Sequence, residues 1–293
     1  MQTNYYLVDE NGVRMRFFTF QLDKAVALCM LSKKRNIMEV QMNSLYKVAL
    51  ILLISLLTLT AVIGCGKKDS KVLRMGTNAE FPPFEYKDGD SFVGVDIDLA
   101  RQIAAKLDME LQIVDMDFDT LLPSVSSNKI DFAMSAISIT EERQALVDFS
   151  QPYYVVNQVF IRALDGKVKL DNPQDIVKYK VGVQGSTTCE AYMKDNYVDK
   201  GTMPQENLMQ YPSNIEAISA LLSGIVDFVI IDASAAKGYA QQKPIEVVHQ
   251  IETNENYGIA LPKNGSKNDK IKQALKELLD SGEVQSIIQT HIN

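Results

Sequence analysis

The sequence predicts an α/β protein built from two lobes. From Val72 onward, short runs rich in β-branched residues alternate with stretches of helical periodicity, which is typical of largely parallel sheets flanked by helices. The alternation restarts after Pro152. Residues 128–132 (NKIDF) and 224–228 (GIVDF) are also alike, since in each a helix ends at a residue that tolerates positive φ and a strand begins with Asp-Phe. Two similar lobes imply a cleft between them, where α/β proteins bind ligands.

The first lobe is expected to begin with the strand that starts at Val72. Leu99, Ile103 and Leu107 recur four residues apart, which indicates an amphipathic helix. Thr140 precedes two glutamates, as is typical of a capped helix whose dipole favours negative charge in the first turn. We expect strands at 72–77, 111–116 and 131–136, and helices at 95–107, 120–127 and 140–147.

The remaining elements are expected to follow Pro152, where the pattern restarts. Residues 228–231 (FVII) form an apolar run that indicates a buried strand, and an alanine-rich helix opens after Asp232. Near the end, Ile271, Leu275 and Leu278 give a helix one apolar face. We expect strands at 158–163, 180–184, 208–211, 227–232 and 257–261, and helices at 187–196, 214–222 and 269–279.

Composition excludes several classes of function. The chain has 293 residues with 30 basic and 37 acidic side chains, and its net charge of −7 disfavours a nucleic-acid binder. Three cysteines and two histidines are too few and too scattered for a disulfide scaffold, a zinc cluster or a histidine-based triad. We therefore expect neither a metal nor a cofactor.

The N-terminal region has the pattern of an export signal. Residues 48–63 carry no charge, and Lys47 and a basic cluster at 33–35 precede them. A membrane span is the alternative, but it needs about 17–25 apolar residues. Residues 62–65 (VIGC) resemble the lipobox of bacterial lipoproteins, although Val and Ile depart from its commoner residues. This predicts a signal peptide at 42–64, lipidation (palmitate) at Cys65 and a polar tether at 65–71. A single acyl chain binds a membrane weakly, so stable attachment requires more than one.

Residues 1–41 precede this signal, although signal peptides normally begin at the chain start. We expect them to be a non-native upstream extension from a misplaced start codon, without a fold of their own.

Several short motifs follow one another between residues 76 and 232, and the resemblance that they carry runs from about Val72 to the end of the chain. They are 76–86 (GTNAEFPPFEY), 94–99 (GVDIDL), 138–143 (SITEER), 148–153 (DFSQPY), 181–187 (VGVQGST) and 231–232 (ID). Together they resemble the family 3 extracellular solute-binding proteins that deliver polar amino acids to ABC importers. The valine in GVDIDL stands where the family usually has a larger residue.

This resemblance implies a two-lobed periplasmic-binding-protein-like fold of type II. Lobe 1 would comprise residues 72–156 and 255–293, and lobe 2 residues 157–254, with hinge crossings near 155–158 and 252–257. It implies a monomer, lipid-anchored to the outer face of the cell membrane, that closes on a polar L-amino acid and hands it to an ABC permease and its ATPase.

The resemblance also names the ligand-binding residues. Arg143, a two-pronged donor, would hold the ligand carboxylate, and Asp232 would accept from its ammonium. Arg143 could instead pair with nearby glutamates on an exposed helix, and Asp232 could simply cap the following helix. The family pattern adds other residues, for which helix capping or core packing are the alternatives: Phe81, Phe118, Ala136, Ser138, Ser186 and Thr187.

Asn78 stands where binders of basic amino acids often have aspartate. A neutral amide favours a glutamine-like ligand. Glu80 could restore acidity, so arginine or another polar amino acid is the alternative ligand. Asn78 could also be only a turn residue. The alternatives to transport are an amino-acid-sensing or adhesive surface lipoprotein and, less favoured, a catalytic relative such as a small-molecule dehydratase. His249 and His291 lie outside the motifs, so we expect no enzyme.

Overall fold

The computed structural model describes residues 6–8, 14–16 and 71–292. β1 (Tyr6–Val8) and β2 (Arg14–Arg16) form an antiparallel pair. This pair lies in the segment expected to have no fold of its own, and two strands alone are marginally stable. The expected signal peptide at 42–64, Cys65 and most of the tether lie outside the described residues. Within the described ranges, no helix is both long enough and apolar enough to span a bilayer.

The first lobe contains a mixed five-stranded sheet of order β7-β3-β8-β15-β9. β3 (Val72–Thr77) pairs in parallel with β7 (Glu110–Asp115) and β8 (Phe132–Ala133). β15 (Ala260–Leu261) pairs antiparallel with β8 and β9 (Asp148–Phe149). Residues from the end of the chain thus complete a sheet that begins at Val72.

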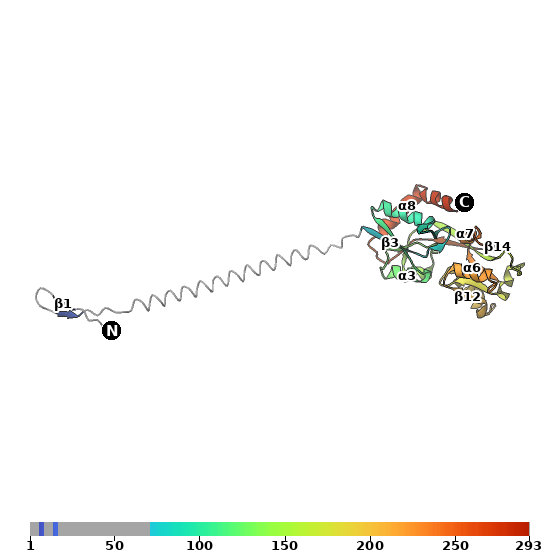
Figure 1. Ribbon diagram of the computed structural model, residues 1–293, viewed down its shortest axis with the longest axis horizontal. Coiled ribbons are helices and arrows are strands. Elements are labelled where there is room, and N and C mark those ends of the chain that lie inside the picture. Colours follow the sequence, from blue (N-terminus) through green and yellow to red (C-terminus); the bar gives the residue numbers. More distant parts are fainter. Residues whose placement is uncertain (1–5, 9–13, 17–70, 293) are drawn as a thin grey trace. The chain divides into compact units, whose positions relative to one another are not determined.

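Helices cover both faces of this sheet, and Figure 1 shows α8 and α3 on opposite sides of β3. The side chains of α2 (Val95–Lys106), α8 (Asn268–Asp280) and α9 (Glu283–His291) form one apolar cluster with β3. α3 (Phe118–Ser126) contributes to a separate cluster, and α4 (Glu141–Leu146) follows it. A small antiparallel sheet joins the lobe before α2: β4 (Glu80–Phe81), β5 (Glu85–Asp88) and β6 (Ser91–Val93).

The second lobe contains a sheet of order β12-β11-β13-β10-β14. β11 (Val181–Gln184) pairs in parallel with β12 (Leu208–Tyr211) and β13 (Phe228–Asp232). β10 (Tyr154–Ala163) is antiparallel to β13 and to β14 (Ile245–Tyr257). Figure 1 shows α6 and β12 together in this body, separate from β3 and its helices.

Two apolar clusters fill the second lobe. One packs α6 (Asn214–Leu222) and α7 (Ala233–Ala240) against the sheet, and the other packs α5 (Thr188–Met193). Short helical turns complete the lobe: the 3₁₀ turns η1 (Pro173–Lys178) and η3 (Gln205–Asn207) and the π turn η2 (Lys194–Val198).

The predicted two-lobed α/β class is confirmed, but each five-stranded sheet is mixed, with two antiparallel pairings beside two parallel ones. The strand expected at 131–136 is only β8, because the chain turns away before Ala136, whose φ is 49°. α9 and most of β14 were not predicted. β14 alternates between partly buried and exposed residues with polar side chains on both sides, so it lacks an apolar signature.

β10 and β14 carry the chain between the lobes. Val156 belongs to the apolar cluster of the first lobe, whereas Val159, three residues later, belongs to a cluster of the second. On β14, Ile251 packs in the second lobe and Tyr257 in the first. The two strands pair in this region with a register shift between Val156 and Gln158. The crossings expected near 155–158 and 252–257 lie on these two strands.

Candidate functional site

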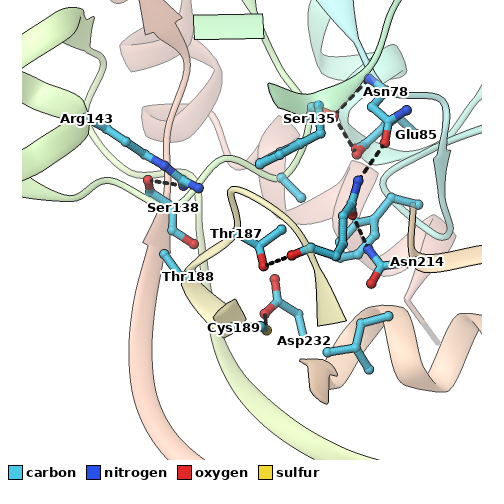
Figure 2. A pocket seen from close by; sticks show the side chains of 15 residues that line it. Asn78, Glu85, Ser135, Ser138, Arg143, Thr187, Thr188, Cys189, Asn214 and Asp232 are labelled. Atoms are coloured by element: carbon cyan, nitrogen blue, oxygen red, sulfur yellow. Dashed lines mark hydrogen bonds between the residues drawn. The ribbon is translucent and has the colours of Figure 1, made fainter. Parts of the chain in front are cut away.

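A pocket of about 440 Å³, including its open mouth, lies where side chains of both lobes meet. Figure 2 shows Arg143 and Ser138 on one side, Asn78, Ser135 and Glu85 on the other, and Asp232 beside Cys189. Eight of the nine predicted site residues line it: Asn78, Phe81, Phe118, Ala136, Ser138, Arg143, Thr187 and Asp232.

Arg143 projects into the pocket from the first turn of α4. Thr140 caps this helix by accepting from the Arg143 backbone N–H at 3.2 Å, as its sequence predicts. The guanidinium donates to the carbonyl oxygens of Ser138 at 2.8 Å and Ser186 at 3.1 Å, and it lies 5.6 Å from the ring centre of Phe118. Neutral carbonyls do not neutralise its charge. Burial lowers the pKa of Arg143 from its ordinary value, although arginine remains protonated.

Asp232 ends β13 at the N-cap position of α7, but its carboxylate makes no capping hydrogen bond. It instead accepts from the Tyr257 hydroxyl and, at 3.6 Å, from the Cys189 thiol. Burial and the nearby charge of Glu255 raise the pKa of Asp232 to about 7. The carboxylate is therefore buried without a full cationic partner, an arrangement that a ligand cation would stabilise.

Glu255 is an acid of the site that the sequence analysis missed. It accepts from the Ser138 hydroxyl at 2.5 Å and from the Gln158 side-chain amide at 2.6 Å. It lies in the crossing segment of β14, opposite Val156 of β10. No motif pointed to it, because the pairing of the two crossing strands brings it to the site.

A group of polar side chains lies opposite Arg143 (Figure 2). Gln184 donates to Asn78 Oδ1 at 3.4 Å across the lobes, and Asn214 donates to Gln184 Oε1 at 2.5 Å. The Asn78 backbone N–H donates to the Ser135 hydroxyl at 3.0 Å, and this hydroxyl donates to Glu85 Oε1 at 3.0 Å. This polar end contains both amide groups and a carboxyl group.

Glu85, rather than Glu80, supplies the acid at this end. Glu80 does not line the pocket, whereas Glu85 does and is 1% exposed. Burial and the charge of Asp96 raise the pKa of Glu85 well above its ordinary value. Glu85 lies opposite Phe81 in the β4–β5 pair, so strand register that the sequence did not predict brings it to the pocket.

The predicted aromatic and small residues form walls of the pocket. Phe81 also packs against apolar clusters of both lobes, and the Phe118 ring faces Arg143. Ala136 donates its backbone N–H to the buried Asp96 at 2.8 Å, which fixes the chain where its φ is positive.

Ser186 and Thr187 differ in position. Thr187 lines the pocket and caps α5, since its hydroxyl accepts from the Glu190 backbone N–H at 3.2 Å. Ser186 lines an outer groove instead, and its backbone N–H donates to the Glu190 carboxylate at 2.6 Å. The N–H of Ser186 is thus already paired with an acid of its own lobe.

Both histidines lie outside the residues that line the pocket. His291 pairs with Asp98 at 2.8 Å, and His249 of β14 packs against Phe160 of β10. Among the described residues, no group of three or more His, Cys, Asp or Glu side chains could hold a metal.

Two α/β lobes, two crossing strands and a polar pocket between the lobes define a two-lobed binding protein of the periplasmic type. The chain matches the family of bacterial extracellular solute-binding proteins, family 3, over residues 73–293, and it belongs to that family.

Named relatives are similar over most of their length. The arginine-binding extracellular protein ArtP of Bacillus subtilis (strain 168) is 31% identical over 249 residues, which cover 81% of this chain and 95% of the relative. An ancestral arginine-binding protein, solved with arginine bound, is 35% identical with a TM-score of 0.69, covering 76% of this chain and 99% of that one. An ancestral arginine-binding protein solved with glutamine is 36% identical with a TM-score of 0.68, covering 75% and 97%.

Proposed function

We propose that this protein binds a polar L-amino acid between its lobes and delivers it to the permease of an ABC transporter. The observation that carries the proposal is the placement of Arg143 and Asp232, on different lobes, around one pocket. An amino acid has one carboxylate and one ammonium, and burying either without a partner is costly. Arg143 suits the carboxylate, and Asp232 suits the ammonium.

We propose that Ser138 and Thr187 also bind the α-amino and carboxylate groups of the ligand. Phe81 and Phe118 would pack against the ligand side chain. The ligand side chain would then point to Asn78, Gln184 and Glu85. The amides suit a glutamine-like ligand, as the sequence suggested, and the acid suits arginine. We therefore propose that the pocket accepts both kinds of side chain, which is consistent with relatives solved with arginine and with glutamine.

Binding would favour the closed arrangement, since the two lobes supply opposite halves of the site and a ligand shifts the population toward the state it binds better. We further propose that the protein is a monomer, exported and held at the membrane by a lipid at Cys65. An ABC permease and its ATPase would be its partners.

A thermal-shift screen of the purified protein against the common L-amino acids tests this function, because a ligand that binds the native state raises its apparent stability. We expect one or a few polar amino acids to raise the melting temperature. Arg143→Ala should abolish the rise, whereas Arg101→Ala, at an exposed arginine paired with Asp98, should preserve it. Equal rises in the wild type and Arg143→Ala would refute the proposed role of Arg143, and no rise with any amino acid would refute the function.

A further inference from the structure

The polar end of the pocket is backed by a pair of buried carboxyl groups, Glu85 and Asp96. Their residues are 1% and 0% exposed. Glu85 lies on β5 and lines the pocket, whereas Asp96 lies in the first turn of α2 behind it. The charge of Asp96 acts on Glu85 and raises its pKa. Two buried carboxyl groups that act on each other are costly to ionise together, so one of them is expected to keep its proton.

The hydrogen-bond partners indicate which acid carries the proton. Asp96 accepts from the Ala136 backbone N–H at 2.8 Å and from the Tyr153 hydroxyl at 2.8 and 2.9 Å, so its ionised form is well supported. Glu85 accepts from Ser135 at one oxygen, and no N–H or O–H of the described residues reaches its other oxygen, Oε2. An oxygen without a donor is the natural place for the proton.

The charges around Glu85 favour the same arrangement. The charged groups with most influence on it are Asp96 on α2 and Asp232 at the start of α7, both acids. Glu85 also acts on the hydroxyls of Tyr153 and Tyr239. Burial raises the pKa of both hydroxyls above the ordinary value. A cation from the ligand would therefore change the electrostatic environment of Glu85 greatly.

We propose that Glu85 is protonated and Asp96 ionised in the unliganded protein, and that a cationic ligand side chain releases the proton of Glu85 to solvent and pairs with the carboxylate that remains. A neutral side chain would meet Glu85 in its protonated form, which can donate as well as accept. One pocket could thus hold arginine or a neutral amide without a buried unpaired charge. This inference rests on the proposed amino-acid binding and names the residue that distinguishes ligand charge.

Proton counting by calorimetry tests the inference. The purified protein is titrated at pH 7 with L-arginine and with L-citrulline, its uncharged analogue of similar shape, in phosphate and in Tris. The difference in heat between the buffers gives the protons released. Any proton released at Asp232 is common to both ligands, because both carry the same ammonium. We expect arginine to release about one proton more than citrulline.

Glu85→Gln should remove this difference and weaken arginine binding by about tenfold or more, with little change for citrulline. Glu110→Gln, at an exposed acid of the same lobe, should leave both results unchanged. Equal proton release for the two ligands, or an unchanged ratio of their affinities in Glu85→Gln, would overturn the inference while leaving amino-acid binding intact.

Two further experimental outcomes also decide whether the inference about the proton of Glu85 stands. If only arginine binds, its proton count must fall in Glu85→Gln for the inference to stand, and an equal count overturns it. If Glu85→Gln does not fold, the wild-type counts decide alone. Failure of every common amino acid to bind would remove the proposed function and this inference with it.

Discussion

The high pKa of Asp232 predicts that ligand affinity falls steeply in mild acid. In the unliganded protein, burial and Glu255 raise this pKa to about 7. The proposed ligand ammonium pairs with the ionised form, so binding requires that Asp232 lose its proton. At a pKa near 7, about nine-tenths of the sites are ionised at pH 8 and about one-hundredth at pH 5. The Kd should therefore rise roughly 90-fold between pH 8 and pH 5.

The sign of the effect on stability is opposite in the unliganded protein. The folded state raises the pKa of Asp232 above its ordinary value of 3.8, so this group favours folding most at low pH. Its contribution is lost as the pH rises from about 4 through about 7. The ligand restores stability in the same range, because it stabilises the ionised carboxylate in the folded state.

Isothermal titration with a neutral ligand, L-glutamine or L-citrulline, measures the Kd without the proton of Glu85. Asp232→Asn should bind more weakly at pH 8 and show a flat pH profile, and Asp165→Asn, at an exposed acid of the same lobe, should match the wild type. Glu255→Gln should move the onset of the affinity loss to lower pH, since it removes the charge that acts most on Asp232. A wild-type Kd constant within threefold from pH 5 to pH 8 would refute this reasoning.

Two further substitutions probe closure and selectivity. A Cβ at Gly238 of α7 would lie 2.7 Å from the Pro82 carbonyl oxygen of the other lobe, so Gly238→Val should weaken binding and shift small-angle scattering toward a more open form. Ala240→Val, exposed on the same helix, is the control, and an unchanged Kd in Gly238→Val would contradict the closure contact. Asn78→Asp adds a carboxylate to the polar end and should raise the preference for arginine over glutamine by about tenfold in titration calorimetry; an unchanged preference would show that Asn78 does not read the ligand side chain.

The sequence was sufficient for the elements with strong local patterns. α6 begins and ends at the expected residues, and α2 and β3 do so within a residue. β14 was largely missed because its charged and amide side chains interrupt any alternation of apolar residues in this edge strand. Local patterns also do not record which strands are antiparallel, so the mixed sheets were not expected.

The residues of the candidate site also fall into two groups, those that local motifs identify and those that tertiary contacts bring to the pocket. Arg143 and Asp232 stand in motifs, and the structure brings both to one pocket. Glu85 stands in a motif too, but its place in the pocket depends on pairing with Phe81. Glu255 and Gln184 act through tertiary contacts, with Ser138 and Asn78 respectively, that no local sequence pattern encodes.

Glu255 lies in a strand that joins the lobes, yet its charge acts on a carboxylate in the pocket. If the lobes separate about this strand, the distance between the two acids changes with the angle. Opening would then be accompanied by exchange of a proton with the surrounding medium. The pH of the surrounding medium would consequently influence how readily the proposed ligand is released.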